Sequence, residues 1–380
     1  MEFAFNQEQK ELQRSARAFL RDHSSSEQVR QAMGSELGYD TDVWERMANE
    51  LGWPALIIPE AYGGYGLGQV ELAVLMEEMG AVLLCSPFFS SVCLAANALI
   101  VGGSEEQKAR YLPAIASGSR LATLALGEVG GQAWTAEAVQ ATARPEGGDF
   151  ILEGIKTYVP DGHTAALFLI AARSPGSNGE QGISLFAVPA DTVGLEVKAL
   201  ATMDQTRRQA EVSLGGVRVP ASSLLGQQGQ GWSVIGPTLD LAAVALSAEQ
   251  VGGAQACLDM TVAYAKERRQ FGREIGSFQA IKHKLADMML LVESARSASY
   301  YAAWAASQGS SELPQLASLA KAYCSDAYFH CAAESIQIHG GVGFTWEYDV
   351  HLYFKRARSS ESLLGDAPYH RELVARSMGL

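Results

Sequence analysis

Apolar and polar positions repeat with two different periods along the chain, and the change of period divides it into three parts. In the first part, apolar side chains recur at three- and four-residue steps, as on one face of an α-helix. Leu12, Ala16 and Leu20 form such a face, and Asn6 begins it with a capping-box pattern. These patterns predict an N-terminal helical domain over residues 1–119.

The middle part changes to short apolar runs separated by Gly, Pro, Asp and Asn. The runs lie at residues 121–126, 136–143, 150–152, 166–172, 183–188 and 210–214. Their length and the turn residues between them are typical of β-strands. We therefore expect a β-domain over residues 120–230, arranged as a sandwich or barrel.

The helical period returns near residue 231 and continues to the end of the chain. Long amphipathic helices are predicted over residues 232–268, 278–307 and 313–338, followed by shorter ones. Long helices joined by short loops favour a four-helix bundle over residues 231–380. The chain is thus predicted to be an α+β protein with helices first, a β-domain second and a helical bundle last.

Composition agrees with a folded protein and limits its partners. The chain has 380 residues, of which 48% are hydrophobic and 19% charged, so it can bury large cores. A net charge of −13 gives no general attraction to nucleic acid or to an anionic membrane. An anionic ligand would need local cations or backbone amides working against this charge.

Cysteine usage and the N-terminus indicate a cellular location. The five cysteines are scattered and form no C-x-x-C pair, which predicts reduced, buried thiols and no metal site. The first residues show no signal-peptide pattern, and charges interrupt the apolar segments before membrane-spanning length. We expect a cytoplasmic protein without membrane insertion.

Several short motifs occur along the chain in a fixed order. They are Leu51-Gly52-Trp53, Pro59-Glu60-x-Tyr62-Gly63-Gly64, Gly103-Ser104-Glu105-Glu106-Gln107-Lys108, Val217-Arg218-Val219-Pro220, Arg268-x-x-Phe271-Gly272 with Phe278-Gln279, and Gln337-x-x-Gly340-Gly341-x-Gly343. Each motif is weak alone, but together and in this order they resemble the acyl-CoA dehydrogenase family over nearly the whole chain.

The resemblance implies a fold, a reaction and partners. Family members usually form tetramers that bind FAD at subunit interfaces. They remove a proton from the α-carbon of an acyl-CoA and pass a hydride from the β-carbon to FAD, as in the β-oxidation steps of lipid degradation. The electrons then pass to an electron-transfer flavoprotein. We therefore expect FAD, an acyl-CoA substrate and a homo- or hetero-oligomer.

The reaction needs a carboxylate base with a raised pKa beside the α-proton. When Ala357 and Gly365 are matched to the family pattern, Leu364 takes the position of the usual glutamate. An alternative base position on the first bundle helix is occupied by Ala242. Neither side chain can accept a proton, so the sequence leaves the catalytic base unassigned.

Three nearby carboxylates are candidate substitutes for the base. Glu361 and Asp366 lie close to position 364, and Glu249 lies two helical turns beyond Ala242. Each also has a structural alternative. Glu361 and Asp366 would then be solvated surface groups, and Glu249 would pair with a buried cation.

The segments that meet the flavin ring in the family also depart from its pattern. Residues 127–134 replace a hydroxyl-rich loop and place Trp134 near an expected serine. Pro160 lies where the family has a hydroxyl side chain, and proline has neither a hydroxyl nor a backbone N–H to offer the flavin.

The bundle motifs that serve a neighbouring subunit's FAD are intact. The resemblance assigns cofactor binding to Arg268, Phe271, Gln279, Gln337, Gly340 and Gly341. Structural roles remain open for several of them. Arg268 could complement a helix end, Gln337 could be a core polar group, and the glycines could end a helix. His339 is expected to be structural.

Three functions remain compatible with these features. The first is a subunit that desaturates an acyl-CoA thioester with FAD, using an unrecognised base. The second is a non-catalytic, FAD-sharing partner in a heterotetrameric acyl-CoA dehydrogenase, such as one acting on sterol side chains. The third is an oxidase or monooxygenase on the same fold.

Overall fold

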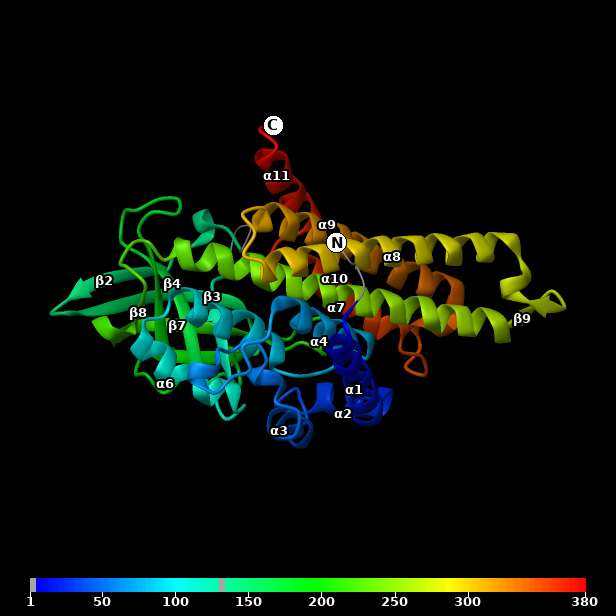
Figure 1. Ribbon diagram of the computed structural model, residues 1–380, viewed down its shortest axis with the longest axis horizontal. Helices are drawn as coiled ribbons and strands as arrows, with labels where there is room; N and C mark the ends of the chain where they lie inside the picture. Colours follow the sequence, from blue (N-terminus) through cyan, green and yellow to red (C-terminus); the bar gives the residue numbers. More distant parts are fainter. Residues whose placement is uncertain (1–4, 130–133) are drawn as a thin grey trace. The chain divides into compact units, whose positions relative to one another are not determined.

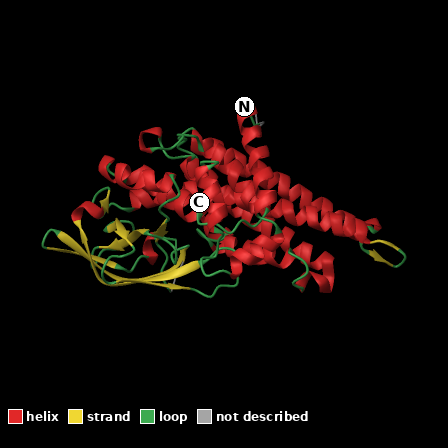
Figure 2. Cartoon of the chain, turned by 90° about the horizontal axis from the view of Figure 1, so that it is seen from below, coloured by secondary structure: helices red, strands yellow, loops and turns green. Residues whose placement is uncertain are grey.

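The computed structural model describes residues 5–129 and 134–380, which form two compact units. The bundle unit contains the described residues up to Gln31, together with Gln69–Leu84 and Ala243–Leu380. The sheet unit contains Ala32–Gly68 and Cys85–Ala242. The predicted order of N-terminal helices, strands and bundle helices is confirmed (Figure 1), and Figure 2 distinguishes the helices from the strands by colour. The N-terminal helices contribute to both units, which the sequence pattern did not indicate.

The described part of the β-domain is one mixed sheet of eight strands. They are β1 (Ala122–Ala125), β2 (Thr142–Glu146), β3 (Asp149–Pro160), β4 (Leu167–Arg173), β5 (Ile183–Pro189), β6 (Leu195–Ala199), β7 (Gln209–Pro220) and β8 (Leu224–Leu225). Their order is β6-β7-β3-β2-β4-β5-β8, and β1 pairs with β4. Both β1 and β2 run parallel to β4, and the other pairs are antiparallel. Phe168, Ile170, Phe186 and Val212 lie in its buried core.

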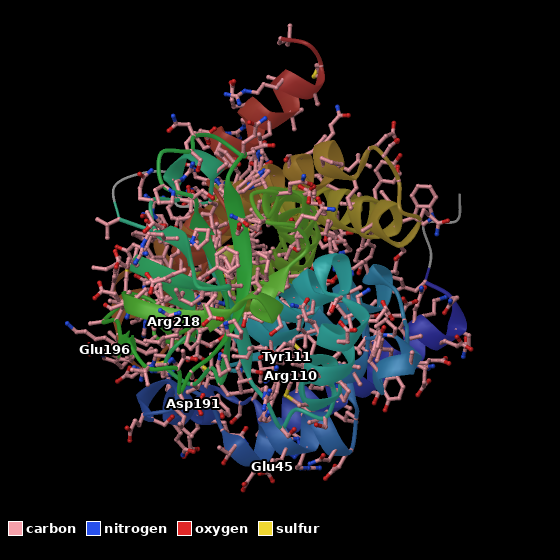
Figure 3. The ribbon with its side chains drawn as sticks, turned by 90° about the vertical axis from the view of Figure 1, so that its left-hand side faces the viewer. Glu45, Arg110, Tyr111, Asp191, Glu196 and Arg218 are labelled. Atoms are coloured by element: carbon pink, nitrogen blue, oxygen red, sulfur yellow. The ribbon has the colours of Figure 1, made fainter. Side chains whose placement is uncertain are left out.

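Two parts of the sheet differ from the prediction. The strand predicted over 136–143 is wrong in its first half, where a 3-10 turn covers Ala136–Ala138. Buried Arg173 binds the carbonyl of Ala136 at 2.7 Å and that of Val139, so these groups need no strand partner. Strand β6 was missed because it is a short, exposed edge strand whose apolar residues alternate with Glu196 and Lys198 and form no continuous apolar run. Its charged Glu196 (Figure 3) is typical of protected sheet edges.

The helices agree closely with the predicted periods. The N-terminal helices are α1 (Gln7–His23), α2 (Ser26–Gly34), α3 (Thr41–Asn49), α4 (Gln69–Ala81), the π-helix η3 (Phe89–Ala96), α5 (Asn97–Gly102) and α6 (Glu105–Ala116). Those of the C-terminal part are α7 (Trp232–Glu267), α8 (Gln279–Ser307), α9 (Leu313–His339), α10 (Val350–Ser362) and α11 (Ala367–Ser377). The capping box at Asn6 is confirmed in both directions.

Helix α9 is the central element of the bundle unit, since it packs against α8, α10 and α11. The cysteines are all free and buried, as expected. Among the described residues, no group of three metal-ligating side chains is placed to hold an ion.

Helix α7 corrects the expectation that no segment reaches membrane-spanning character. By length and composition alone it is apolar enough to cross a membrane. However, 72% of its most apolar window is buried inside the protein. A core helix can be as long and as apolar as a membrane-spanning one, and the burial of α7 is typical of a core helix.

Helices α4 and α7 approach each other so closely that their backbones touch. A Cβ added to Gly252 on α7 would lie 1.9 Å from the carbonyl oxygen of Glu77. A Cβ added to Gly80 on α4 would lie 2.0 Å from the carbonyl oxygen of Glu249. The two contacts are reciprocal, so each helix requires a glycine where the other crosses it.

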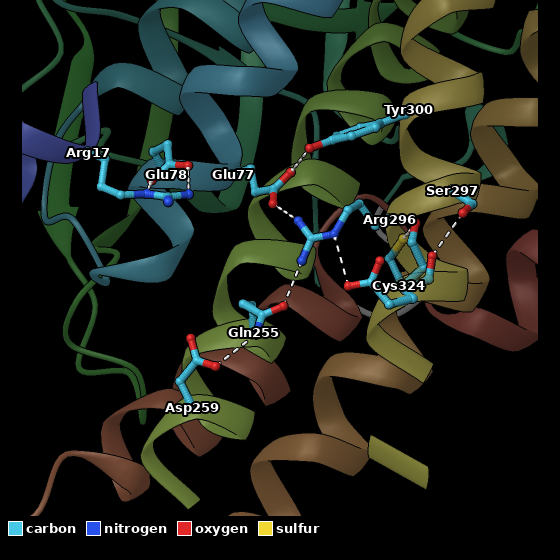
Figure 4. Close-up of polar contacts among 11 residues, drawn as sticks. Arg17, Glu77, Glu78, Gln255, Asp259, Arg296, Ser297, Tyr300 and Cys324 are labelled. Atoms are coloured by element: carbon cyan, nitrogen blue, oxygen red, sulfur yellow. Dashed lines mark hydrogen bonds and ion pairs between the residues drawn. The ribbon is translucent and has the colours of Figure 1, made fainter. Parts of the chain in front are cut away.

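Buried carboxylates beside this crossing are paired with cations (Figure 4). Glu77 accepts hydrogen bonds from Arg296 and from the Tyr300 hydroxyl at 2.6 Å. Glu78 accepts two from Arg17 of α1, at 2.7 and 2.9 Å. A buried carboxylate without such partners would be strongly destabilising, so these contacts join α1 and α8 to α4.

We predict that Gly252→Ala destabilises the protein by about 2–3 kcal/mol, because the new methyl group meets a backbone carbonyl that cannot rotate away. Gly34→Ala is the matched control. This helical glycine has nothing within 4 Å of an added Cβ, so alanine should stabilise by up to about 1 kcal/mol. Urea unfolding of both variants measures the difference. Equal stability of the two would contradict the close crossing.

Candidate active site

The customary base position lies in the turn between α10 and α11. Leu364 occupies it, is 3% exposed and has a left-handed backbone with φ of 64°. Gly365 follows with φ of 104°. The alternative position, Ala242 on α7, is completely buried. Both positions thus present an apolar side chain, as the sequence indicated.

Two of the candidate substitutes are engaged in local structural contacts. Glu361 pairs with Arg358, one helical turn away, at 2.5 Å. Asp366 caps α11 by accepting a hydrogen bond from the backbone N–H of Tyr369 at 2.9 Å. Asp366 is exposed, as the structural alternative expects, whereas Glu361 is partly buried and ion-paired.

The third candidate, Glu249, forms a buried ion pair with Arg356 of α10 at 2.9 Å. The side chains are 5% and 3% exposed, respectively. A guanidinium at this distance favours the ionised carboxylate and occupies it, and removing one partner would leave a buried charge. The alternative that Glu249 pairs with a buried cation is therefore confirmed.

Asp240 is a carboxylate with an unusual pKa that the sequence pattern did not indicate. Burial raises the pKa of Asp240 on α7 to about 7. It forms no hydrogen bond or ion pair with the residues that the structure describes. Residues that are two positions apart in an α-helix lie about 200° apart around its axis. Asp240 and Ala242 therefore face nearly opposite directions. Asp240 therefore does not simply replace a base at 242.

A cavity of about 350 Å³ in the bundle unit gathers part of the predicted cofactor set. Phe271 and Gln337 line it together with Gln270, Ile275, Phe278, Ile281, Lys284 and Ile338. Arg268 and Gln279 lie nearby in sequence but do not line it. The sequence motifs therefore located this cavity, although they did not indicate its apolar wall.

A short hairpin presents Phe271 at one side of the cavity. Strands β9 (Arg269–Gln270) and β10 (Arg273–Glu274) are joined by Phe271 and Gly272, with φ of 53° and 80°. Positive φ at both central residues is the mark of a tight hairpin turn. Phe271 is 93% exposed, and Arg273 lies 4.0 Å over the ring of Phe278. The hairpin thus offers exposed aromatic and cationic groups.

The remaining cofactor candidates are also accessible. Arg268 is exposed, and its guanidinium forms no ion pair with any residue in the described ranges. Gly340 and Gly341 follow α9, and a Cβ added to either would meet nothing within 4 Å. Gln279 is exposed and lies 3.4 Å from His283. Gln337 is exposed as well, which excludes the alternative of a core polar group.

These groups fit part of a phosphate-bearing aromatic cofactor such as FAD. An unengaged guanidinium suits a pyrophosphate, exposed glycine backbone permits close approach, and the apolar cavity suits a flat ring. His339 has the structural role expected for it. Its ring stacks on Tyr264 at 4.2 Å, and its Nδ1 contacts the carbonyl of Ser335 at 2.7 Å.

The segments that correspond to the family's flavin-ring loops contain a buried ion pair. Lys156 is fully buried and donates to Glu128 at 2.5 Å, and burial lowers the pKa of this lysine to about 8. Glu128 also accepts from the N–H groups of Gln140 and Ala141 at 3.0 Å. Residues 130–133 of the predicted loop lie outside the described residues, whereas Trp134 is buried and Pro160 ends β3.

Family models and a known relative match nearly the whole length of the chain. Models of the acyl-CoA dehydrogenase N-terminal, middle and C-terminal domains match residues 6–119, 123–216 and 229–379. The chain is 36% identical over 360 residues to the acyl-CoA dehydrogenase IpdE2 of Mycolicibacterium smegmatis, covering 95% of each protein.

Solved structures share the fold over the same length. In the ChsE4–ChsE5 complex from Mycobacterium tuberculosis, one chain is 29% identical with a TM-score of 0.90, covering 100% of this chain and 99% of that one. PigA, solved with FAD and proline, is 26% identical with a TM-score of 0.92 and full coverage of both chains. The sequence, the fold and these matches agree that the chain belongs to the acyl-CoA dehydrogenase family of oxidoreductases.

Proposed function

We propose that this chain is the base-lacking subunit of a hetero-oligomeric acyl-CoA dehydrogenase and completes a FAD site on a base-bearing partner of the same family. One observation carries the proposal. The three candidate substitutes for the base, Glu249, Glu361 and Asp366, are each committed to a structural contact, while Phe271, Arg268 and the glycine turn remain open to a ligand.

The partner would supply the base and the acyl-CoA site, and FAD would accept the hydride when bound. This chain would contribute Phe271 and the cavity wall to a ring of the cofactor and Arg268 to a phosphate. The ChsE4–ChsE5 complex supports a pair of different family members, and PigA supports FAD as the cofactor. Electron transfer to an electron-transfer flavoprotein and a sterol side-chain substrate follow from the resemblance and belong to the proposal.

Flavin counting tests the proposal directly. The tagged chain should be purified alone and from its native source, and co-purified proteins identified by mass spectrometry. Alone, it should carry little FAD and no desaturase activity. With a co-expressed family partner it should form a yellow, active complex with one FAD per pair of chains. A homo-oligomer with full FAD and desaturase activity would contradict the proposal, and oxygen consumption without CoA-ester turnover would favour an oxidase.

A second prediction concerns Arg268 in that complex. Loss of one charge-assisted contact should weaken FAD binding about ten-fold or more in Arg268→Ala, measured by flavin release on dilution. The matched control is Arg269→Ala. Its guanidinium already pairs with Glu274 across the exposed hairpin at 3.1 Å, a contact that contributes little to stability. Equal FAD affinity in both variants would remove Arg268 from the cofactor site.

The competing function is an active chain that uses Asp240, because its pKa of about 7 suits a general base. Our proposal expects Asp240→Asn to leave turnover of the complex unchanged, whereas loss of a general base would lower it about 10²- to 10⁴-fold. The pH dependence of stability gives an independent check that the pKa of Asp240 is raised. The folded pKa lies above the unfolded value, so wild-type stability should fall as pH rises from about 4 to 7. The asparagine variant should lack this fall.

A further inference from the structure

In the turn between α10 and α11, backbone carbonyls accept hydrogen bonds from side chains that lie outside the turn. Helix α10 ends at Ser362, and α11 begins at Ala367. The last carbonyls of a helix have no partner within it and need one from elsewhere. Here the carbonyls of Glu361, Leu364 and Gly365 are all satisfied by side chains.

Lys321 of α9 makes two of these contacts from beneath the turn. Its Nζ donates to the carbonyls of Glu361 at 3.1 Å and Gly365 at 3.0 Å, and to the Ser325 hydroxyl at 2.9 Å. Three acceptors match the three N–H groups of an ammonium. The residue is completely buried, and burial lowers its pKa to about 7, opposed by Cys324, Glu361, Asp366 and Asp326.

His370 of α11 makes the third contact. Its Nε2 lies 3.0 Å from the carbonyl of Leu364, and burial lowers the pKa of this imidazole to about 4. The neutral ring therefore donates its one N–H to this carbonyl. The turn is held from α9 on both sides of Leu364 and from α11 at Leu364 itself.

The backbone at Leu364 does not adopt its conformation by local preference. Left-handed φ is unfavourable for leucine, which has none of the freedom of glycine. Such a residue persists where surrounding contacts over-determine it. The sequence around Leu364 offers only Gly365 as a flexible neighbour, so the determining contacts come from outside the turn.

We infer that Lys321 is a positioning residue for site 364, and that it sets the left-handed turn which directs whatever side chain stands at the customary base position. The backbone conformation that directs this side chain is thus held by a residue of α9, whatever residue stands at position 364. This inference concerns the bundle unit alone and holds whether or not the partner-subunit proposal is correct.

The chain offers a clean way to measure opening of this turn. All five native cysteines are buried, so Leu364→Cys places a reporter thiol in the turn. Its labelling by N-ethylmaleimide, followed by mass spectrometry of the full-length protein and its peptides, reports how often the turn opens. Ala357→Cys is the matched reporter, because Ala357 on α10 is 1% exposed and lies outside the turn.

Each reporter is then measured with native Lys321 and with Lys321→Met, which keeps an unbranched side chain, one atom shorter, and removes its donors. We expect labelling at 364 to accelerate about ten- to hundred-fold in Lys321→Met, with labelling at 357 nearly unchanged. Unchanged labelling at 364 would overturn the inference, because the turn would then hold itself. Equal acceleration at both sites would also overturn it, since Lys321 would then serve general stability.

Ser325→Ala gives a milder perturbation for use if Lys321→Met does not fold. It removes one of the three acceptors of the ammonium and leaves both carbonyl contacts in place. Labelling at 364 should again accelerate more than at 357, by a smaller factor. Identical labelling rates at position 364 with and without Ser325 would count against the inference that Lys321 holds the turn.

Discussion

The bundle unit depends on the backbone contact between α4 and α7. Because Gly80 and Gly252 each face a carbonyl of the other helix, the two axes cannot move apart without losing that contact or together without a clash. The residues whose carbonyls are touched, Glu77 and Glu249, carry side chains that ion-pair with Arg296 and Arg356. The crossing therefore fixes both buried carboxylates, and through them the places of α8 and α10.

This arrangement explains why Glu249 is not a spare base. Its carboxylate lies near the crossing and is needed by Arg356, whose charge would otherwise be buried alone. Lys321 also serves a structural contact, since its ammonium satisfies carbonyls at the end of α10. Several charged groups inside this bundle join helices, whereas the hairpin and the glycine turn are exposed.

The sequence predicted the features that depend on local pattern. Helical periods located α7, α8 and α9 within about one residue, and the motifs led to Phe271 and Gln337, which do share a cavity. The features it missed depend on contacts distant in sequence. Asp240 looks like any helical aspartate until its burial is known, and Lys321 is informative only once the carbonyls of Glu361 and Gly365 are seen beside it.

The hairpin that carries Phe271 has a consequence for how such a protein would be made. A phenylalanine that is 93% exposed, together with the largely exposed Met289, Leu290 and Phe344, leaves apolar surface in contact with water whenever no other chain covers it. Surface of this kind promotes unwanted association. The chain by itself is therefore expected to be prone to aggregation and degradation, and the partner subunit proposed above would protect it by covering this surface.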